Sequence, residues 1–301
     1  MSLPAPASSI HGPSPSASAS NRSTDPAELP EISVTLDEQR LHIGEGVISV
    51  FVTNNTGASL SVSAVSLATP LFKEPSVWTP GPSGSSTLRP GATIAFPTAL
   101  AAAQCDDNSA PRDRPQEQPH YQPRGQAPQP GTGQPETANV LLTLNGQQHK
   151  FEATDPHASL DKLQREDCLE QAVREIALLD LMPALTVAAD RRTAVVHLSI
   201  VPTGISGDLL LSGFGNTTLL TENPQQPWPR NISISGTDAP SIVDLAVTPA
   251  RCDGHALAED KAGTKLPVNV TTSHQSGQLR LEPSTDFTRS VYAFVSTACG
   301  N

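Results

Sequence analysis

The side chains best suited to chemistry gather in the segment CDGHALAEDKAGTKLPV, residues 252–268. Its polar candidates are Asp253, His255, Glu259, Asp260 and Lys261. His255 and Glu259 are four positions apart, so a helix would place them on one face, where they could hold a metal or act as acid and base. The same letters also fit one structural helical turn, with Asp253 as N-cap and Gly263 after its end. One histidine and one glutamate are too few metal ligands, so we predict no metal and no catalytic residue here.

Other catalytic patterns are weak. The chain has no Gly-X-Ser-X-Gly elbow, and SGFGN at residues 212–216 lacks the lysine and the strand–helix context of a phosphate loop. Its eight histidines are scattered, with none paired at ligand spacing. A serine nucleophile stays open, because triads assemble from distant positions. The sequence therefore predicts no cofactor.

The cysteines and tryptophans indicate an internal repeat. They occur in the order Trp78, Cys105, Cys168 and then Trp228, Cys252, Cys299. Asp follows the first cysteine of each half, and an apolar run containing proline precedes it, at residues 92–100 and 241–249. We interpret the two tryptophans as equivalent core or loop anchors; the alternative is a pair of sugar-stacking platforms.

After each of these runs the sequence predicts a hairpin. Residues 140–151 turn at Asn145–Gly146, a strong signal for a two-residue hairpin loop. Residues 266–281 are expected to turn near Ser276–Gly277.

A short helix is predicted after each hairpin, ending at or near the second cysteine. In the first half Asp155 is the expected N-cap and Pro156 the first helical residue, with Leu160 and Leu163 facing inward. In the second half Ser284 is the expected N-cap and Gly300 the stop. The inward face of the second helix is predicted to carry Phe287, Val291, Phe294, Val295 and Ala298.

Short alternating apolar runs separated by turn residues fill most of the remaining chain, for example Ile48, Val50 and Val52. The pattern predicts an all-β chain of two tandem immunoglobulin-like β-sandwiches, each with a short C-terminal helix and one disulfide. We expect the first sandwich at residues 31–170 and the second at residues 171–301. Residues 108–135, rich in proline and glutamine, are interpreted as a disordered insert, either a tolerated surface loop or a docking segment.

Pairing within each half would join Cys105 to Cys168 and Cys252 to Cys299. By closing a loop in the unfolded chain, each bond would stabilise the folded state by on the order of 4 kcal/mol in the chain-entropy model. An even cysteine count at repeat-equivalent positions favours an oxidising compartment. Four free buried thiols in a cytosolic protein remain the alternative, and a zinc site is disfavoured because the cysteines lack close pairs.

Charge and composition exclude some partners. A net charge of −11 disfavours nucleic acid and anionic membrane surfaces. No apolar run approaches the ~18 residues of a membrane span. Residues 1–30 are rich in Pro, Ser and Ala, and we read them as a disordered tether of an exported protein whose export signal is not visible. A cytosolic protein with a disordered tail is the alternative.

Three stretches carry a resemblance to known proteins: PARCDGHALAEDKAGTKLPV at residues 249–268, Leu88–Gly91 before Cys105–Asp106, and VYAFVSTACG at residues 291–300. In these the chain resembles a group of uncharacterised actinobacterial envelope proteins and lipoproteins. The resemblance covers most of residues 31–301 and implies location and architecture only. The missing lipid-attachment cysteine leaves the mode of anchoring open.

The sequence therefore predicts a non-enzymatic extracytoplasmic envelope protein, a binding or structural module whose partner is another envelope or extracellular protein. The alternative is a hydrolase or metal-dependent enzyme that uses residues 253–261. A ligand-binding accessory protein for transport is a third possibility.

Overall fold

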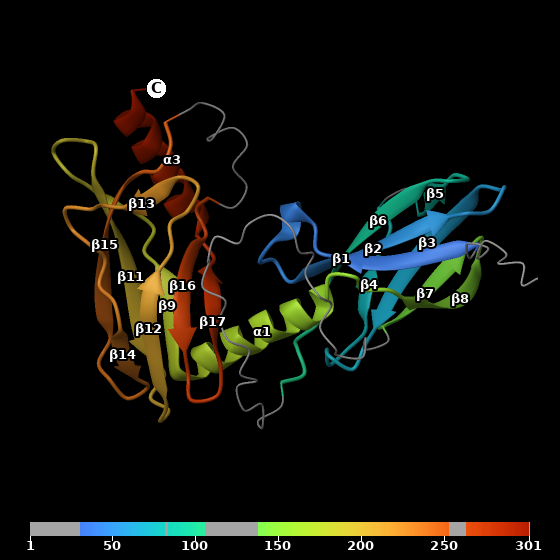
Figure 1. The fold of residues 1–301 in the computed structure, drawn as a ribbon, viewed down its shortest axis with the longest axis horizontal. Helices are drawn as coiled ribbons and strands as arrows, with labels where there is room; N and C mark the ends of the chain where they lie inside the picture. The colour runs from blue at the N-terminus through green and yellow to red at the C-terminus, as the bar shows by residue number, and fades with distance from the viewer. Residues whose placement is uncertain (1–30, 82–83, 106–137, 253–262, 301) are drawn as a thin grey trace, which may run out of the picture. The chain divides into compact units, whose positions relative to one another are not determined.

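The computed structural model describes residues 31–81, 84–105, 138–252 and 263–300. Within these ranges the chain is mostly β-strand, arranged in four sheets of antiparallel strands, with two α-helices and one short 3-10 helix (Figure 1). The sheets enclose two separate hydrophobic cores. This confirms the predicted fold class of two tandem immunoglobulin-like β-sandwiches, each followed by a helix and each holding one disulfide.

The first sandwich consists of a three-stranded sheet packed against a larger sheet. The smaller sheet has the order β1-β2-β6 and consists of β1 (Ile32–Asp37), β2 (Val47–Asn54) and β6 (Thr93–Ala99). The larger has the order β4-β3-β7-β8, with β5 also paired to β3, and consists of β3 (Leu60–Ala68), β4 (Ser76–Trp78), β5 (Ser86–Leu88), β7 (Ala138–Leu144) and β8 (Gln147–Ala153). A 3-10 turn, η1 (Arg40–His42), joins β1 to β2. The chain crosses between the two sheets after β2, after β5 and after β6, as expected for an immunoglobulin-like sandwich.

The second sandwich has a related arrangement, but its first sheet has five strands instead of three. Its first sheet runs β10-β11-β15-β13, with β9 also paired to β11, from the strands β9 (Ala177–Leu181), β10 (Thr186–Val187), β11 (Ala194–Pro202), β13 (Leu220–Glu222) and β15 (Ser241–Pro249). The facing sheet runs β14-β12-β16-β17, from β12 (Asp208–Phe214), β14 (Ile232–Ser235), β16 (Leu266–Thr271) and β17 (Ser276–Leu281). In both sandwiches the last hairpin, β7–β8 or β16–β17, leads into a helix.

Helix α1 (Ser159–Ile176) contributes side chains to both cores. Leu160 and Leu163, from its first half, lie in the first core together with Cys168. Leu169, Val173 and Ile176, from its second half, lie in the second core. At ~100° per residue these two sets point about 180° apart around the helix axis. Opposite faces of one helix therefore serve two different cores.

The ends of α1 differ from the prediction. The helix begins at Ser159, three residues after Pro156, although the Asp155 carboxylate still accepts hydrogen bonds from the N–H groups of Ser159 (2.8 Å) and Leu160 (2.9 Å). It also does not end near Cys168 but continues to Ile176 and passes directly into β9. The prediction failed because the apolar face changes sides after Cys168.

The second helix and the first hairpin follow the prediction. In α3 (Thr285–Cys299) the Ser284 hydroxyl accepts a hydrogen bond from the N–H of Phe287 (3.1 Å), and Gly300 ends the helix in the left-handed conformation. Asn145 and Gly146 both have positive φ, as a two-residue hairpin turn requires. The second hairpin was placed wrongly: Gly277 pairs with Val270 inside the sheet, and the chain turns between β16 and β17, where the N–H of Thr272 donates to the carbonyl of Gln275.

Each disulfide joins a segment that follows a strand of the sandwich to the helix that comes after the last hairpin. Cys105–Cys168 ties the chain after β6 to α1, and Cys252–Cys299 ties the chain after β15 to α3. The two tryptophans are packed as anchors: Trp78 lies edge-on to Phe96, and the buried Trp228 donates its indole N–H to the carbonyl of Ala246 (2.6 Å). Among the described residues no helix is long and apolar enough to span a bilayer.

Gly236 provides a test of the second sandwich. A Cβ at this position would lie 1.9 Å from the carbonyl oxygen of Ile205, so the backbone must shift to accept any side chain. We expect Gly236→Ala to lower the free energy of unfolding by about 3 kcal/mol. Gly57→Ala is the matched control, since a Cβ there meets nothing within 4 Å. Urea unfolding of both variants checks this, and equal stabilities would contradict it.

Candidate functional site

The five polar residues singled out at 253–261 lie outside the described residues, so the structure neither assembles nor separates them. The four cysteines are all bonded in two disulfides. Their sulfurs are therefore not free to act as nucleophiles or metal ligands. Among the described residues no three His, Cys, Asp or Glu side chains come close enough together to hold a metal ion.

A polar row crosses three strands of the second sandwich. His197 on β11 lies between two partners, with its Nδ1 2.6 Å from the Asp244 carboxylate and its Nε2 2.8 Å from the Thr186 hydroxyl. Strand pairing places this row, because His197 stands directly opposite Asp244 of β15, while β10 carries Thr186 along the other side of β11. The order hydroxyl, imidazole, carboxylate can pass a proton along the row.

The surroundings of this row favour a structural role. The Asp244 side chain is 67% exposed and that of His197 22%, so water competes for every bond in the row. Leu178 of β9, Val201 of β11 and Ile242 of β15 are exposed apolar side chains on the same sheet. Linking β10, β11 and β15 through one histidine ties the two-residue strand β10 to the sheet.

The turn between β10 and β11 is held by a carboxylate. Asp190 accepts hydrogen bonds from the N–H groups of Arg192 (2.9 Å) and Thr193 (3.1 Å), and these bonds hold the pKa of Asp190 below its ordinary value. The turn fixes the position of β10 and, with it, that of Thr186.

Strand β8 forms an edge of the first sandwich. Leu144 pairs with Gln147 across the Asn145–Gly146 turn, so the backbone groups of the alternate residues Gln148, Lys150 and Glu152 point away from β7. In the described part of the chain, β8 pairs with no strand other than β7, and Thr154, the residue directly after β8, forms a single bridge with Thr35. Lys150 carries a charge of the kind that discourages strand pairing at a sheet edge.

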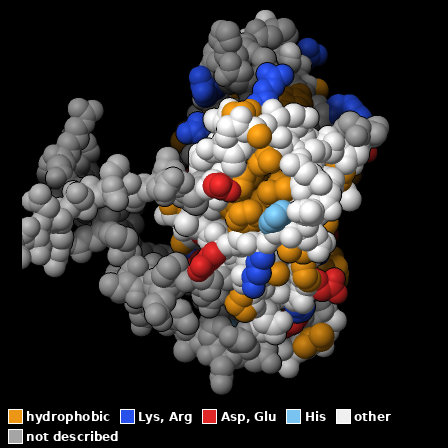
Figure 2. Space-filling model, turned by 90° about the vertical axis from the view of Figure 1, so that its right-hand side faces the viewer, with side chains coloured by type: hydrophobic (Ala, Val, Ile, Leu, Met, Phe, Trp, Pro, Cys, Tyr) orange, Lys and Arg blue, Asp and Glu red, His pale blue; other side chains and the backbone are white. Residues whose placement is uncertain are grey.

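Figure 2 shows charged side chains scattered around a group of apolar ones on one face of the molecule.

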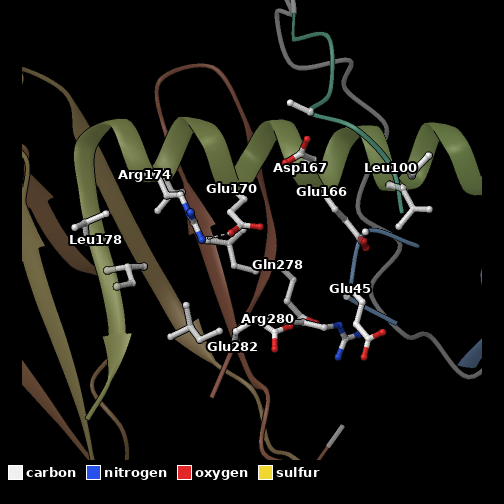
Figure 3. A pocket seen from close by; sticks show the side chains of 18 of the residues that line it. Glu45, Leu100, Glu166, Asp167, Glu170, Arg174, Leu178, Gln278, Arg280 and Glu282 are labelled. Carbon is white, nitrogen blue, oxygen red and sulfur yellow. Dashed lines mark ion pairs between the residues drawn. The ribbon is translucent and has the colours of Figure 1, made fainter. Parts of the chain in front are cut away.

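A hollow borders α1, and β17 forms part of its wall (Figure 3). Arg174 and Glu170 form an ion pair of 2.7 Å along the helix. Gln278, Arg280 and Glu282 extend from β17 and the residue after it. Glu282 is itself paired with Lys265 at 2.6 Å, so several of the charges around the hollow already have a partner within the fold.

A denser charge cluster lies where α1 meets the end of β1. The Lys162 ammonium pairs with the Glu38 carboxylate and lies 3.8 Å from the Glu166 carboxylate. The Glu38 side chain is only 7% exposed, and its Oε1 is buried with no hydrogen-bond partner among the described residues. Burial raises the pKa of Glu166, with Lys162 acting in the opposite direction and Glu38 adding to the rise. Sequence reasoning missed this cluster, because Glu38 and Lys162 are 124 residues apart.

No family model and no curated protein matches this chain. Among solved structures, it is similar to a chain of the CsuC–CsuE chaperone–tip adhesion subunit complex of Acinetobacter baumannii Csu pili, with 8% identity, a TM-score of 0.20 and coverage of 79% of this chain and 92% of that one. The YadV chaperone has 13% identity and a TM-score of 0.19, with coverage of 84% and 100%. The calcium-binding domain CBD12 of CALX1.1 has 8% identity and a TM-score of 0.19, with coverage of 81% and 78%. Scores this low assign neither a family nor an activity.

The polar row leads to a stability prediction. We expect His197→Ala and Asp244→Ala each to lower the free energy of unfolding by less than about 1 kcal/mol, because the pair is exposed. A double-mutant cycle in urea measures their coupling. A coupling energy above ~2 kcal/mol would show that the row is more than a surface contact.

The turn carboxylate leads to a pH prediction. Because the folded pKa of Asp190 is lowered, its contribution to stability is complete above the unfolded pKa of about 4 and disappears as the pH falls through the folded pKa. Asp190→Asn keeps an acceptor but removes the charge. We therefore expect this variant to lower the urea midpoint at neutral pH, with the difference shrinking toward about pH 2. A constant difference across this range would contradict the assignment.

Proposed function

We propose that this chain is a non-enzymatic, extracytoplasmic module of the cell envelope that binds another envelope or extracellular protein or supports an assembly. The observation that carries the proposal is the pair of disulfides, one in each sandwich, which leaves none of the four cysteines free. Disulfides of this structural kind persist in oxidising compartments and are rare in the cytosol.

The scaffold also supports a binding or structural role. Two sandwiches present several sheet faces and edges, among them the exposed Leu178, Val201 and Ile242 on the sheet that contains β11. Helix α1 contributes side chains to both cores. With a net charge of −11, the preferred partner is a protein surface rather than nucleic acid.

Three further points belong to this proposal. The related arrangement of the two sandwiches supports their origin by duplication, and the actinobacterial envelope family remains the proposed relative. The proposed boundaries are residues 1–30, 31–170 and 171–301, with the second boundary falling inside α1. Hydrolase or metal chemistry at residues 253–261 stays a sequence prediction.

Cell fractionation of the native protein tests the compartment. Cells are lysed with an alkylating reagent and without reductant, and the protein is followed by peptide mass spectrometry. We expect it outside the cytoplasmic fraction, with Cys105 linked to Cys168, Cys252 linked to Cys299, and no alkylated cysteine. Alkylated cysteines in the cytoplasmic fraction would overturn the proposal. Partner binding that survives His255→Ala would separate the module from the enzyme alternative.

A further inference from the structure

Glu38 is an unusual carboxylate. It directly follows β1, its side chain is only 7% exposed, and one of its oxygens is buried without a hydrogen-bond partner among the described residues. Such an oxygen has lost its hydrogen bonds to water and gained none in the protein, so its desolvation costs free energy that is not offset. The ion pair with Lys162 involves only the other carboxylate oxygen, Oε2, and leaves Oε1 without a partner among the described residues.

Two further groups complete the arrangement. Lys162 brings its amine to the Glu38 carboxylate from α1, which is fixed to the same sandwich by Leu160, Leu163 and the Cys105–Cys168 bond. One helical turn later, Glu166 places a carboxylate oxygen 3.8 Å from the same amine. An amine, a buried carboxyl group and a second carboxylate therefore stand together.

We propose that Lys162 and Glu38 become joined by an amide bond in the folded chain, with Glu166 transferring the protons. Glu166 takes a proton from the Lys162 ammonium, and the neutral Nζ attacks the carboxyl carbon of Glu38. A C–N bond forms, and the nitrogen gives up a second proton to one Glu38 oxygen while Glu166 returns the first proton to the same oxygen. The C–O bond to that oxygen then breaks and the oxygen leaves as water, so the ammonium and the carboxylate become an amide and one water. The atoms balance without an oxidant, a reductant or a cofactor.

The local physics favours this condensation over the same reaction in water. Groups held in contact by a fold can act at effective concentrations of about 10⁵–10⁸ M, which offsets the excess of water that normally drives amide hydrolysis. The product is neutral, so it removes the burial cost of the Glu38 charge. A raised pKa of Glu166 suits a group that must both accept and return a proton.

The second sandwich offers an internal control. Lys265 and Glu282 form an ion pair of 2.6 Å, but here the carboxylate is the exposed member, with 61% of its side chain accessible. The carboxyl group in this pair is therefore well hydrated, and the same reasoning predicts no bond there.

Intact-mass spectrometry of the purified full chain, denatured and reduced, tests the proposal. The reduced chain is expected to be one water lighter than its sequence, and digestion should give one linked peptide pair joining Glu38 to Lys162. A mass equal to that of the sequence would overturn the inference. So would a lost water that maps to any other position.

Variants separate the roles. Lys162→Arg should restore the full sequence mass, whereas Lys265→Arg should still lack one water. Glu38→Gln should form the same amide with loss of ammonia instead of water. Glu166→Gln should slow bond formation in the newly synthesised chain, followed by intact mass over time after synthesis, by about 10²–10⁴-fold, the usual size of an acid–base contribution. Formation at the wild-type rate in Glu166→Gln would exclude Glu166 as the proton carrier, and a lost water in Lys162→Arg would overturn the bond itself.

Discussion

One helix has to satisfy two hydrophobic cores at once. The first half of α1 buries Leu160 and Leu163 in one core, and the second half buries Leu169, Val173 and Ile176 in the other. Because these sets face opposite sides of the helix, neither half can unwind or rotate without exposing apolar surface. The helix also continues into β9 with no loop residue, so the first strand of the second sandwich begins where α1 ends.

Polar contacts hold α1 against the first sandwich at the same height as its disulfide. The Asp167 carboxylate accepts a hydrogen bond from the N–H of Ala103 (2.6 Å), and the Gln164 amide donates to the carbonyl of Gln104 (2.7 Å). These residues flank Cys168 and Cys105, so the covalent bond and the hydrogen bonds fix the same two segments. At the start of the helix, Lys162 meets Glu38 of the strand end. Helix α1 is therefore tied to this sandwich along its first half by apolar, covalent and charged contacts.

The sequence predicted those parts of the fold that local patterns determine. The apolar run at residues 241–249 forms β15. Asn145–Gly146 and Ser284 act as the predicted turn and cap, because their conformations depend on near neighbours. The prediction ended helix α1 too early. The apolar residues lie on one face of the helix up to Cys168 and on the opposite face after it, so a pattern that follows a single face stops at Cys168. The polar contacts were beyond local reasoning. His197 meets Asp244 through strand register across 47 residues, and Glu38 meets Lys162 through tertiary packing.

The change of face within α1 constrains how this chain can change in length. One residue inserted between Cys168 and Leu169 would turn the second apolar face by about 100° relative to the first, while leaving each half intact as a helix. A deletion would turn it equally far the other way. Insertions of about seven residues, close to two full turns, are the shortest that bring both faces nearly back into phase. Insertions and deletions in the loops of the sandwiches have no such effect on the two apolar faces. Changes in chain length are therefore least tolerated within this helix.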